Sequence, residues 1–252
     1  MLIDTHCHLD FPEFDADRSL VVAQAQEEGV GFIINIGSSI TGSVNSVNLA
    51  GEFENVFAVI GCHPHDAAGF RPQDLATLRS LAASKKVKAI GEIGLDYYRN
   101  LSPQKDQQEL FVQLIRLARE LALPVVIHSR QAEEDSLAIL RQEKVTRGIV
   151  HCFGGSERFL HQCLDAGLYV SFTCNITYKK AEGLRDIVRM VPSDRFCLET
   201  DAPYLAPEGY RGKRNEPKFV RMLAEAVAKI RGISPEEVGA FTTQNAKIFF
   251  GL

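Results

Sequence analysis

The chain opens with Leu2-Ile3-Asp4-Thr5, a short run with the character of a buried strand, and this run leads directly into His6-Cys7-His8. Four more runs of this kind each end at a side chain that can bind a metal. They are Lys88–Gly91 before Glu92, Val125–Ile127 before His128, Gly148–Val150 before His151, and Phe196–Thr200 before Asp201. A parallel barrel presents the C-terminal ends of its strands on one face. We therefore expect these six side chains to converge there.

Three further apolar runs complete a set of eight strand-like segments: Gly31–Gly37, Val56–Gly61 and Leu168–Phe172. The runs are rich in Val and Ile and nearly continuously apolar, which is typical of strands buried on both faces. Segments with helical spacing of apolar residues alternate with them. This alternation predicts an α/β fold, a (β/α)8 TIM barrel, with residues 1–252 forming a single domain.

Several of the expected helices carry recognisable start signals. Ser102-Pro103 supplies an N-cap and a first-turn proline. Ser156 precedes an amphipathic stretch that ends near Gly167, and Ser234-Pro235-Glu236-Glu237 forms a capping box. These signals place helices after the fourth, sixth and eighth predicted strands.

Composition limits the class of protein. The 252 residues are 45% hydrophobic and 24% charged, as in ordinary globular proteins. The net charge of −4 argues against a protein that coats nucleic acid, but it permits an enzyme that holds one strand end locally. No apolar run approaches the roughly 18 residues that cross a bilayer, and the N-terminus lacks a signal-peptide pattern. We expect a cytoplasmic protein with no membrane contact and no obligate protein partner.

The six cysteines form no Cys-x-x-Cys pair, and Cys7, Cys62, Cys152 and Cys197 lie in or beside the strand-like runs. We expect reduced, buried thiols that pack as small apolar side chains. A role for Cys7 as a metal ligand is set aside, because strand side chains alternate between faces and Cys7 does not share the face of its histidine neighbours.

Four imidazoles and two carboxylates are enough for a two-metal hydrolytic site. A buried carboxylate at Glu92 is costly unless it is paired or ligates a metal, and we expect it to bridge two cations through its two oxygens. Asp4 is a candidate for orienting a ligand imidazole. The mixture of nitrogen and oxygen ligands permits zinc, manganese, cobalt or magnesium. Taken singly, each residue also fits a hydrogen-bonded core histidine, an ion pair or a turn. Six such coincidences favour one site.

Other polar residues point to the substrate. We expect His63 to contact substrate, with a seventh metal ligand as the alternative, and His65 to be a surface loop residue. Two basic groups follow the seventh and eighth strands, where barrels frequently bind phosphate. They are Lys179, Lys180, Arg185 and Arg189, and then Arg211, Lys213, Arg214, Lys218 and Arg221 with only Glu216 opposing them. These groups favour a phosphate ester as substrate, with Lys179 and Arg214 as contacts.

The motifs together closely resemble the TatD family of metal-dependent deoxyribonucleases over essentially the whole chain. The matching blocks are Asp4–Asp10, Gly61–Pro64, Gly91–Tyr97, His128–Arg130, His151–Gly155, Glu199–Pro203, Arg214–Pro217 and Asn245–Leu252. The resemblance implies two divalent cations. It gives one cation to His6, His8, Glu92 and Asp201, and the other to the shared Glu92 with His128 and His151. It also implies that His63 lies near the substrate phosphate and that the substrate is DNA.

We therefore expect a divalent-metal-dependent hydrolase of phosphodiester bonds, a deoxyribonuclease acting as an exonuclease on single-stranded DNA ends. A metal-bridged hydroxide would attack, with Glu92 and Asp201 as catalytic residues and Asp201 accepting the proton. One alternative is a hydrolase of the same barrel type acting on an acyl ester, lactone or amide. Such enzymes often use a carboxylated lysine at strand four, where Lys88 lies at the wrong end. The other alternative is a non-catalytic metal-binding scaffold, which would be expected to lack a ligand.

Overall fold

A computed structural model describes residues 1–252. Its strands β1 to β8 are Leu2–Cys7, Val30–Gly37, Val56–Ile60, Val87–Asp96, Val125–Arg130, Gly148–Val150, Tyr169–Phe172 and Phe196–Leu198. Its helices α1 to α9 are Arg18–Glu27, Ile40–Glu52, Pro72–Leu81, Gln104–Glu120, Glu133–Gln142, Glu157–Asp165, Glu182–Met190, Val220–Arg231 and Pro235–Phe250. Short 3-10 helices η1 to η4 cover Pro12–Phe14, Pro64–Gly69, Cys174–Thr177 and Pro217–Phe219.

The sheet has eight strands in the order of the chain, β1 to β8. The registered pairs β1–β2, β3–β4, β4–β5, β5–β6 and β7–β8 are all parallel. An isolated parallel bridge joins Cys7 to Ala202, beyond the end of β8, and so connects the last strand back to the first. Parallel strands that alternate with helices in this order confirm the predicted (β/α)8 barrel fold.

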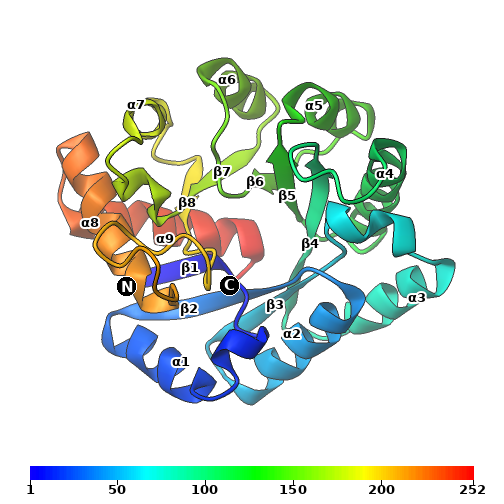
Figure 1. Cartoon of the computed structure of the whole chain (residues 1–252), viewed down its shortest axis with the longest axis horizontal. Helices are drawn as coiled ribbons and strands as arrows, with labels where there is room; N and C mark the ends of the chain where they lie inside the picture. The colour runs from blue at the N-terminus through cyan, green and yellow to red at the C-terminus, as the bar shows by residue number, and fades with distance from the viewer. The chain divides into compact units, whose positions relative to one another are not determined.

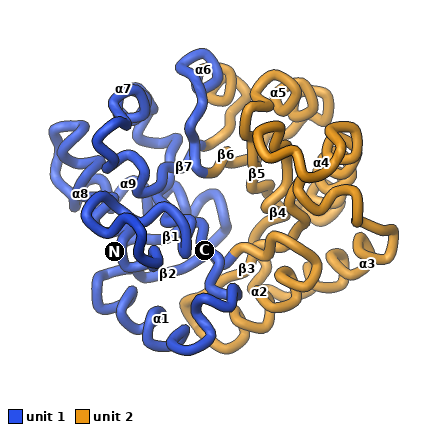
Figure 2. Tube along the Cα trace, in the orientation of Figure 1, with its two compact units in different colours: residues 1–35, 152–160, 170–252 blue, residues 36–151, 161–169 orange.

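The chain divides into two compact units (Figure 2). Unit 1 comprises Met1–Asn35, Cys152–Leu160 and Val170–Leu252. Within it α8 and α9 pack on β1 and β8, and α9 begins at the predicted capping box of Ser234 and Glu237 (Figure 1). The helices bury the apolar surface of β1, whose six residues are all buried.

Unit 2 comprises Ile36–His151 and His161–Tyr169. Within it α2 packs on β3 and α4 packs on β4, outside the strands (Figure 1). Leu110, Phe111 and Leu114 form part of the buried face of α4. The single domain over residues 1–252 stays a prediction.

Several boundaries differ from the sequence-based expectation. Glu92 does not end its strand, because β4 continues through Ile93 and Leu95 to Asp96. Ser102 is not the N-cap of α4, since Pro103 occupies that position. The Ser102 hydroxyl instead donates to the His65 carbonyl oxygen at 2.7 Å, and so fastens η2.

All six cysteines are free thiols, and five of them are buried: Cys7, Cys62, Cys163, Cys174 and Cys197. Their burial agrees with the expected packing as small apolar side chains, whereas Cys152, expected to be buried as well, is only half-buried. None of the helices has both the length and the apolar character that crossing a membrane requires.

Candidate metal centre

Unit 1 brings together three of the predicted ligands: His6, His8 and Asp201. The backbone N–H of Asp201 donates to the His6 carbonyl oxygen at 2.8 Å, and that of His8 donates to Ala202 at 2.8 Å. These parallel bonds place the residues after β8 alongside the end of β1. Asp201 takes a left-handed conformation with φ of 57°. Such a conformation is uncommon outside glycine, although Asp and Asn adopt it more readily than other residues, and it recurs at functional sites.

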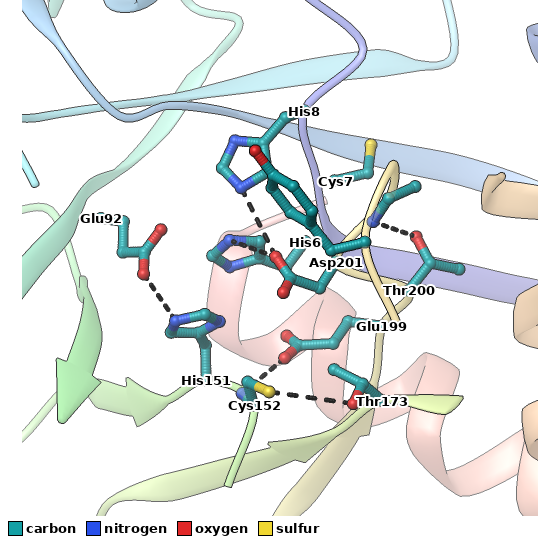
Figure 3. Close-up of polar contacts among 12 residues, drawn as sticks. His6, Cys7, His8, Glu92, His151, Cys152, Thr173, Glu199, Thr200 and Asp201 are labelled. Carbon is teal, nitrogen blue, oxygen red and sulfur yellow. Dashed lines mark hydrogen bonds and ion pairs between the residues drawn. The ribbon is translucent and has the colours of Figure 1, made fainter. Parts of the chain in front are cut away.

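The carboxylate of Asp201 faces both histidines (Figure 3). Its Oδ1 atom lies 3.7 Å from His6 Nε2 and 3.5 Å from His8 Nε2. Both imidazoles are buried. Two ring nitrogens and a carboxylate oxygen at these separations match the donor types that zinc and similar divalent cations prefer.

Asp4 stabilises the backbone that carries these ligands. Its Oδ1 accepts hydrogen bonds from the N–H groups of Thr200 at 2.9 Å and His6 at 3.2 Å, and its Oδ2 contacts the Thr200 hydroxyl at 2.6 Å. Complete burial raises the pKa of Asp4 to about 8. Asp4 was a candidate for orienting an imidazole ring. These hydrogen bonds instead fix the main chain before Asp201 and at His6.

Unit 2 brings together the other three predicted ligands, and His63 joins them. The Oε1 atom of Glu92 lies 2.6 Å from His128 Nδ1 and 2.6 Å from His151 Nε2. Figure 3 shows the carboxylate turned towards the His151 ring. His63 Nε2 lies 3.5 Å from the same oxygen. The ligand atoms of His63, Glu92 and His128 all lie within 4.8 Å of one another, so this cluster suits a metal.

The imidazoles around Glu92 lower the pKa of its carboxyl group. Burial by itself would raise the pKa of Glu92, but His151, His63 and His128 outweigh it and hold that pKa well below its usual range. Burial lowers the pKa of His63. Burial also opposes the charged form of His128, but hydrogen bonds to Asp96 and Glu92 raise its pKa overall. Glu92 is therefore ionised, the form in which a carboxylate binds a cation.

Asp96 is a residue of this cluster that the sequence analysis missed. Its Oδ2 lies 3.3 Å from His128 Nε2 and 2.9 Å from His65 Nε2. A carboxylate on the far nitrogen of a ligand imidazole fixes the ring and raises its basicity. The expectation that His65 is only a surface loop residue is therefore wrong, because its ring is bound to the buried Asp96. The signal lay in the Gly91–Tyr97 motif, which ends with Asp96-Tyr97.

Gly94 allows β4 and β5 to approach beside His128. Its φ of 141° is one that side chains rarely permit, and a Cβ there would overlap the His128 carbonyl oxygen. Glycine at this position keeps β5, which carries the predicted ligand His128, close to β4.

Glu199 was also missed, although it lies two residues before Asp201. Its Oε1 accepts the Cys152 N–H at 2.6 Å and its Oε2 accepts the Ser171 hydroxyl at 2.6 Å. Cys152 itself has a φ of 46°. The buried carboxylate therefore holds the strained residue that directly follows His151.

The basic groups are less available than the sequence suggests. Lys179 is exposed, as a substrate contact requires. Arg214, in contrast, donates to Asp17 at 2.7 and 2.8 Å and to Glu216 at 2.9 Å. Glu216 is therefore not the only opposing charge. Asp17, which lies just before α1 and is remote in sequence, also pairs with Arg214. The roles of Lys179 and Arg214 at the substrate stay predictions.

A (β/α)8 barrel with buried histidine and carboxylate clusters fits the class of metal-dependent hydrolases. A family model described as TatD related DNase matches residues 3–251. The chain belongs to the TatD family.

Three relatives illustrate the range of the family. The chain is 40% identical over 252 residues to the uncharacterized metal-dependent hydrolase YabD of Bacillus subtilis, covering 99% of each chain. It is 37% identical over 259 residues to the 3'-5' ssDNA/RNA exonuclease TatD of Erwinia amylovora, covering 100% of each. The crystal structure of the TatD homologue YJJV from Escherichia coli superposes with a TM-score of 0.94 at 29% identity, covering 100% of this chain and 98% of that one.

Proposed function

We propose that this hydrolase cleaves phosphodiester bonds of nucleic acid and that it removes nucleotides from single-stranded DNA ends. The observation that carries the proposal is the Glu92 carboxylate, whose Oε1 lies 2.6 Å from a ring nitrogen of both His128 and His151. A relative at 37% identity is named a ssDNA/RNA exonuclease, which supports this choice of substrate.

The residues of both clusters fit divalent cations by donor type. His6, His8 and Asp201 would hold one, His128 and His151 the other, and Glu92 would bridge them. We treat the two clusters as one site because a parallel barrel presents the C-terminal ends of its strands on one face. Bound cations would lower the pKa of a water molecule and neutralise charge on the phosphate oxygens.

The chain's own residues would perform the remaining work. Asp201 accepts the proton of the attacking water at a carboxylate oxygen. The oxygen of that water bonds to phosphorus as the bond to the departing sugar oxygen breaks, and the sugar oxygen takes up a proton from solvent to leave as a hydroxyl. His63, close to Glu92, orients the phosphate, and Asp96 holds the His128 ring in place.

The test is cleavage of an end-labelled single strand and of the same sequence as blunt duplex, with and without chelator, then with added Mg²⁺, Mn²⁺, Co²⁺ or Zn²⁺. We expect metal-dependent shortening that is faster on the single strand. Asp201→Asn, purified identically, detects any contaminating nuclease. A panel of small carboxylic esters and lactones is run beside it. Robust ester turnover with no DNA cleavage would assign the protein to the acyl hydrolases.

A further inference from the structure

Two exposed side chains, Tyr98 and Arg130, stack just beyond the cluster of Glu92 and His128. The guanidinium carbon of Arg130 lies 4.1 Å from the centre of the Tyr98 ring. Arg130 is exposed, and Tyr98 keeps 56% of its surface in water. A ring exposed to this extent contributes little to a core, so burial does not explain the pair.

The backbone that presents this pair is firmly held. Arg99 N–H donates to Asp96 Oδ1 at 2.8 Å, which closes the turn that carries Tyr98. Tyr97 N–H donates to the Arg130 carbonyl oxygen at 3.0 Å, which ties that turn to the end of β5. Asp96 is the same carboxylate that contacts His128 Nε2. The Asp96 carboxylate therefore holds both the turn that carries Tyr98 and the imidazole of His128.

The charge of Arg130 is not paired with a carboxylate. Arg79, Arg116 and Arg214 each form ion pairs with carboxylates. The Arg130 guanidinium has the Tyr98 ring beneath it and no carboxylate within ion-pair distance. Stacking uses the flat face of a guanidinium and leaves its N–H edge able to donate hydrogen bonds. That planar edge matches two oxygens of a phosphate.

We propose that Arg130, oriented by Tyr98, binds a phosphate group of the substrate strand. The inference rests on the proposed nuclease function and names a contact for it. Arg130 is the binding residue, and Tyr98 is a positioning residue that holds the guanidinium flat. A single contact of this kind would also let a chain with a net charge of −4 bind a nucleic-acid strand without a broad basic surface.

The test measures kcat and KM on a single-stranded oligonucleotide across a salt series. Arg130→Gln should raise KM about tenfold or more at low salt, because a charge-assisted hydrogen bond is lost. The slope of log(kcat/KM) against log salt should become shallower by about 0.7, the share of one phosphate on a single strand. Arg130→Lys should lie between these values, since it keeps the charge and loses the planar edge.

The Tyr98 variants separate positioning from general stability. Tyr98→Phe keeps the ring and should match wild type, whereas Tyr98→Leu should raise KM severalfold. In an Arg130→Gln background Tyr98→Leu should have no further effect on KM, because the group it positions is gone. Additive effects of the two changes would overturn the positioning role.

Arg147→Gln is the matched control. Arg147 precedes β6, at the opposite end of the strands, and removal of its charge should leave KM and the salt slope near wild type. An Arg130→Gln enzyme that cleaves DNA with unchanged KM and slope would overturn the inference and leave the proposed function standing. If wild type cleaves no DNA, the proposed function fails. Oligonucleotide binding in chelator then tests Arg130 directly, and equal affinity of wild type and Arg130→Gln would overturn this inference as well.

Discussion

Asp201 combines a carboxylate placed beside two imidazoles with a strained backbone conformation. It faces two imidazoles and holds a left-handed backbone beside them. The sequence predicted the residue because it follows an apolar run. It did not predict the backbone conformation. That conformation depends on two hydrogen bonds between distant segments, from Asp201 N–H to the His6 carbonyl oxygen and from His8 N–H to the Ala202 carbonyl oxygen.

Asp201→Asn should abolish turnover and preserve the fold. Asparagine tolerates the same left-handed conformation and has the same size, but it loses the charge and the basicity. We expect kcat to fall by roughly 10²-fold or more in metal-saturated enzyme. Circular dichroism and the melting temperature should stay close to wild type. A near-normal kcat would remove Asp201 from the role of proton acceptor.

Asp96 and Glu199 mark the limit of sequence reasoning at this scale. Each lies in a motif that also holds a predicted ligand, but the local sequence does not show which residue its carboxylate contacts. Asp96 acquires its role from His128, 32 residues away, and Glu199 from Cys152, 47 residues away. Contacts of this kind appear only once the strands are assembled.

At the scale of elements, all eight strands were predicted because buried parallel strands are apolar on both faces. Their ends were less accurate. The apolar run of β4 is interrupted at Glu92, yet the strand continues to Asp96 through a register shift between Ile90 and Ile93. A polar ligand within a strand interrupts the pattern that reveals the strand.

The β4–β5 contact makes Gly94 a sensitive position. Gly94→Ala should displace the His128 carbonyl oxygen and lower metal affinity. The free energy of unfolding should fall by about 2 kcal/mol or more, because the backbone is strained and the new Cβ overlaps that oxygen. Denaturant unfolding and metal titration measure the two effects.

Gly183→Ala in α7 is the control, because a Cβ there meets no atom within 4 Å. It should leave metal binding unchanged and the fold equally or slightly more stable. Equal behaviour of the two variants would mean that the β4–β5 spacing tolerates a side chain at Gly94.

For the whole molecule, the main prediction concerns metal content. Gently purified protein should contain close to two divalent ions per chain, and their removal by chelator should lower the melting temperature, because cations that bind only the folded chain stabilise it. Elemental analysis and thermal unfolding provide the measurements. One ion at saturation, with Glu92→Ala binding as well as wild type, would contradict a bridged pair.

His63→Ala distinguishes the two roles open to that histidine. As a substrate contact, it should weaken phosphodiester cleavage and keep the metal content of wild type. Its Nε2 lies 3.5 Å from Glu92 Oε1, so a fall in metal content on substitution would make it a ligand instead.

The distribution of thiols gives this protein built-in reporters. Cys7 lies between two predicted ligand histidines, Cys62 precedes His63 and Cys152 follows His151. Burial raises the pKa of Cys62 to about 12, and an unexposed, protonated thiol reacts slowly with alkylating agents. Alkylation at such a site therefore requires local opening of the chain. Peptide mass spectrometry after timed alkylation would show which strand end opens first and which one a given cation keeps closed, without any introduced label.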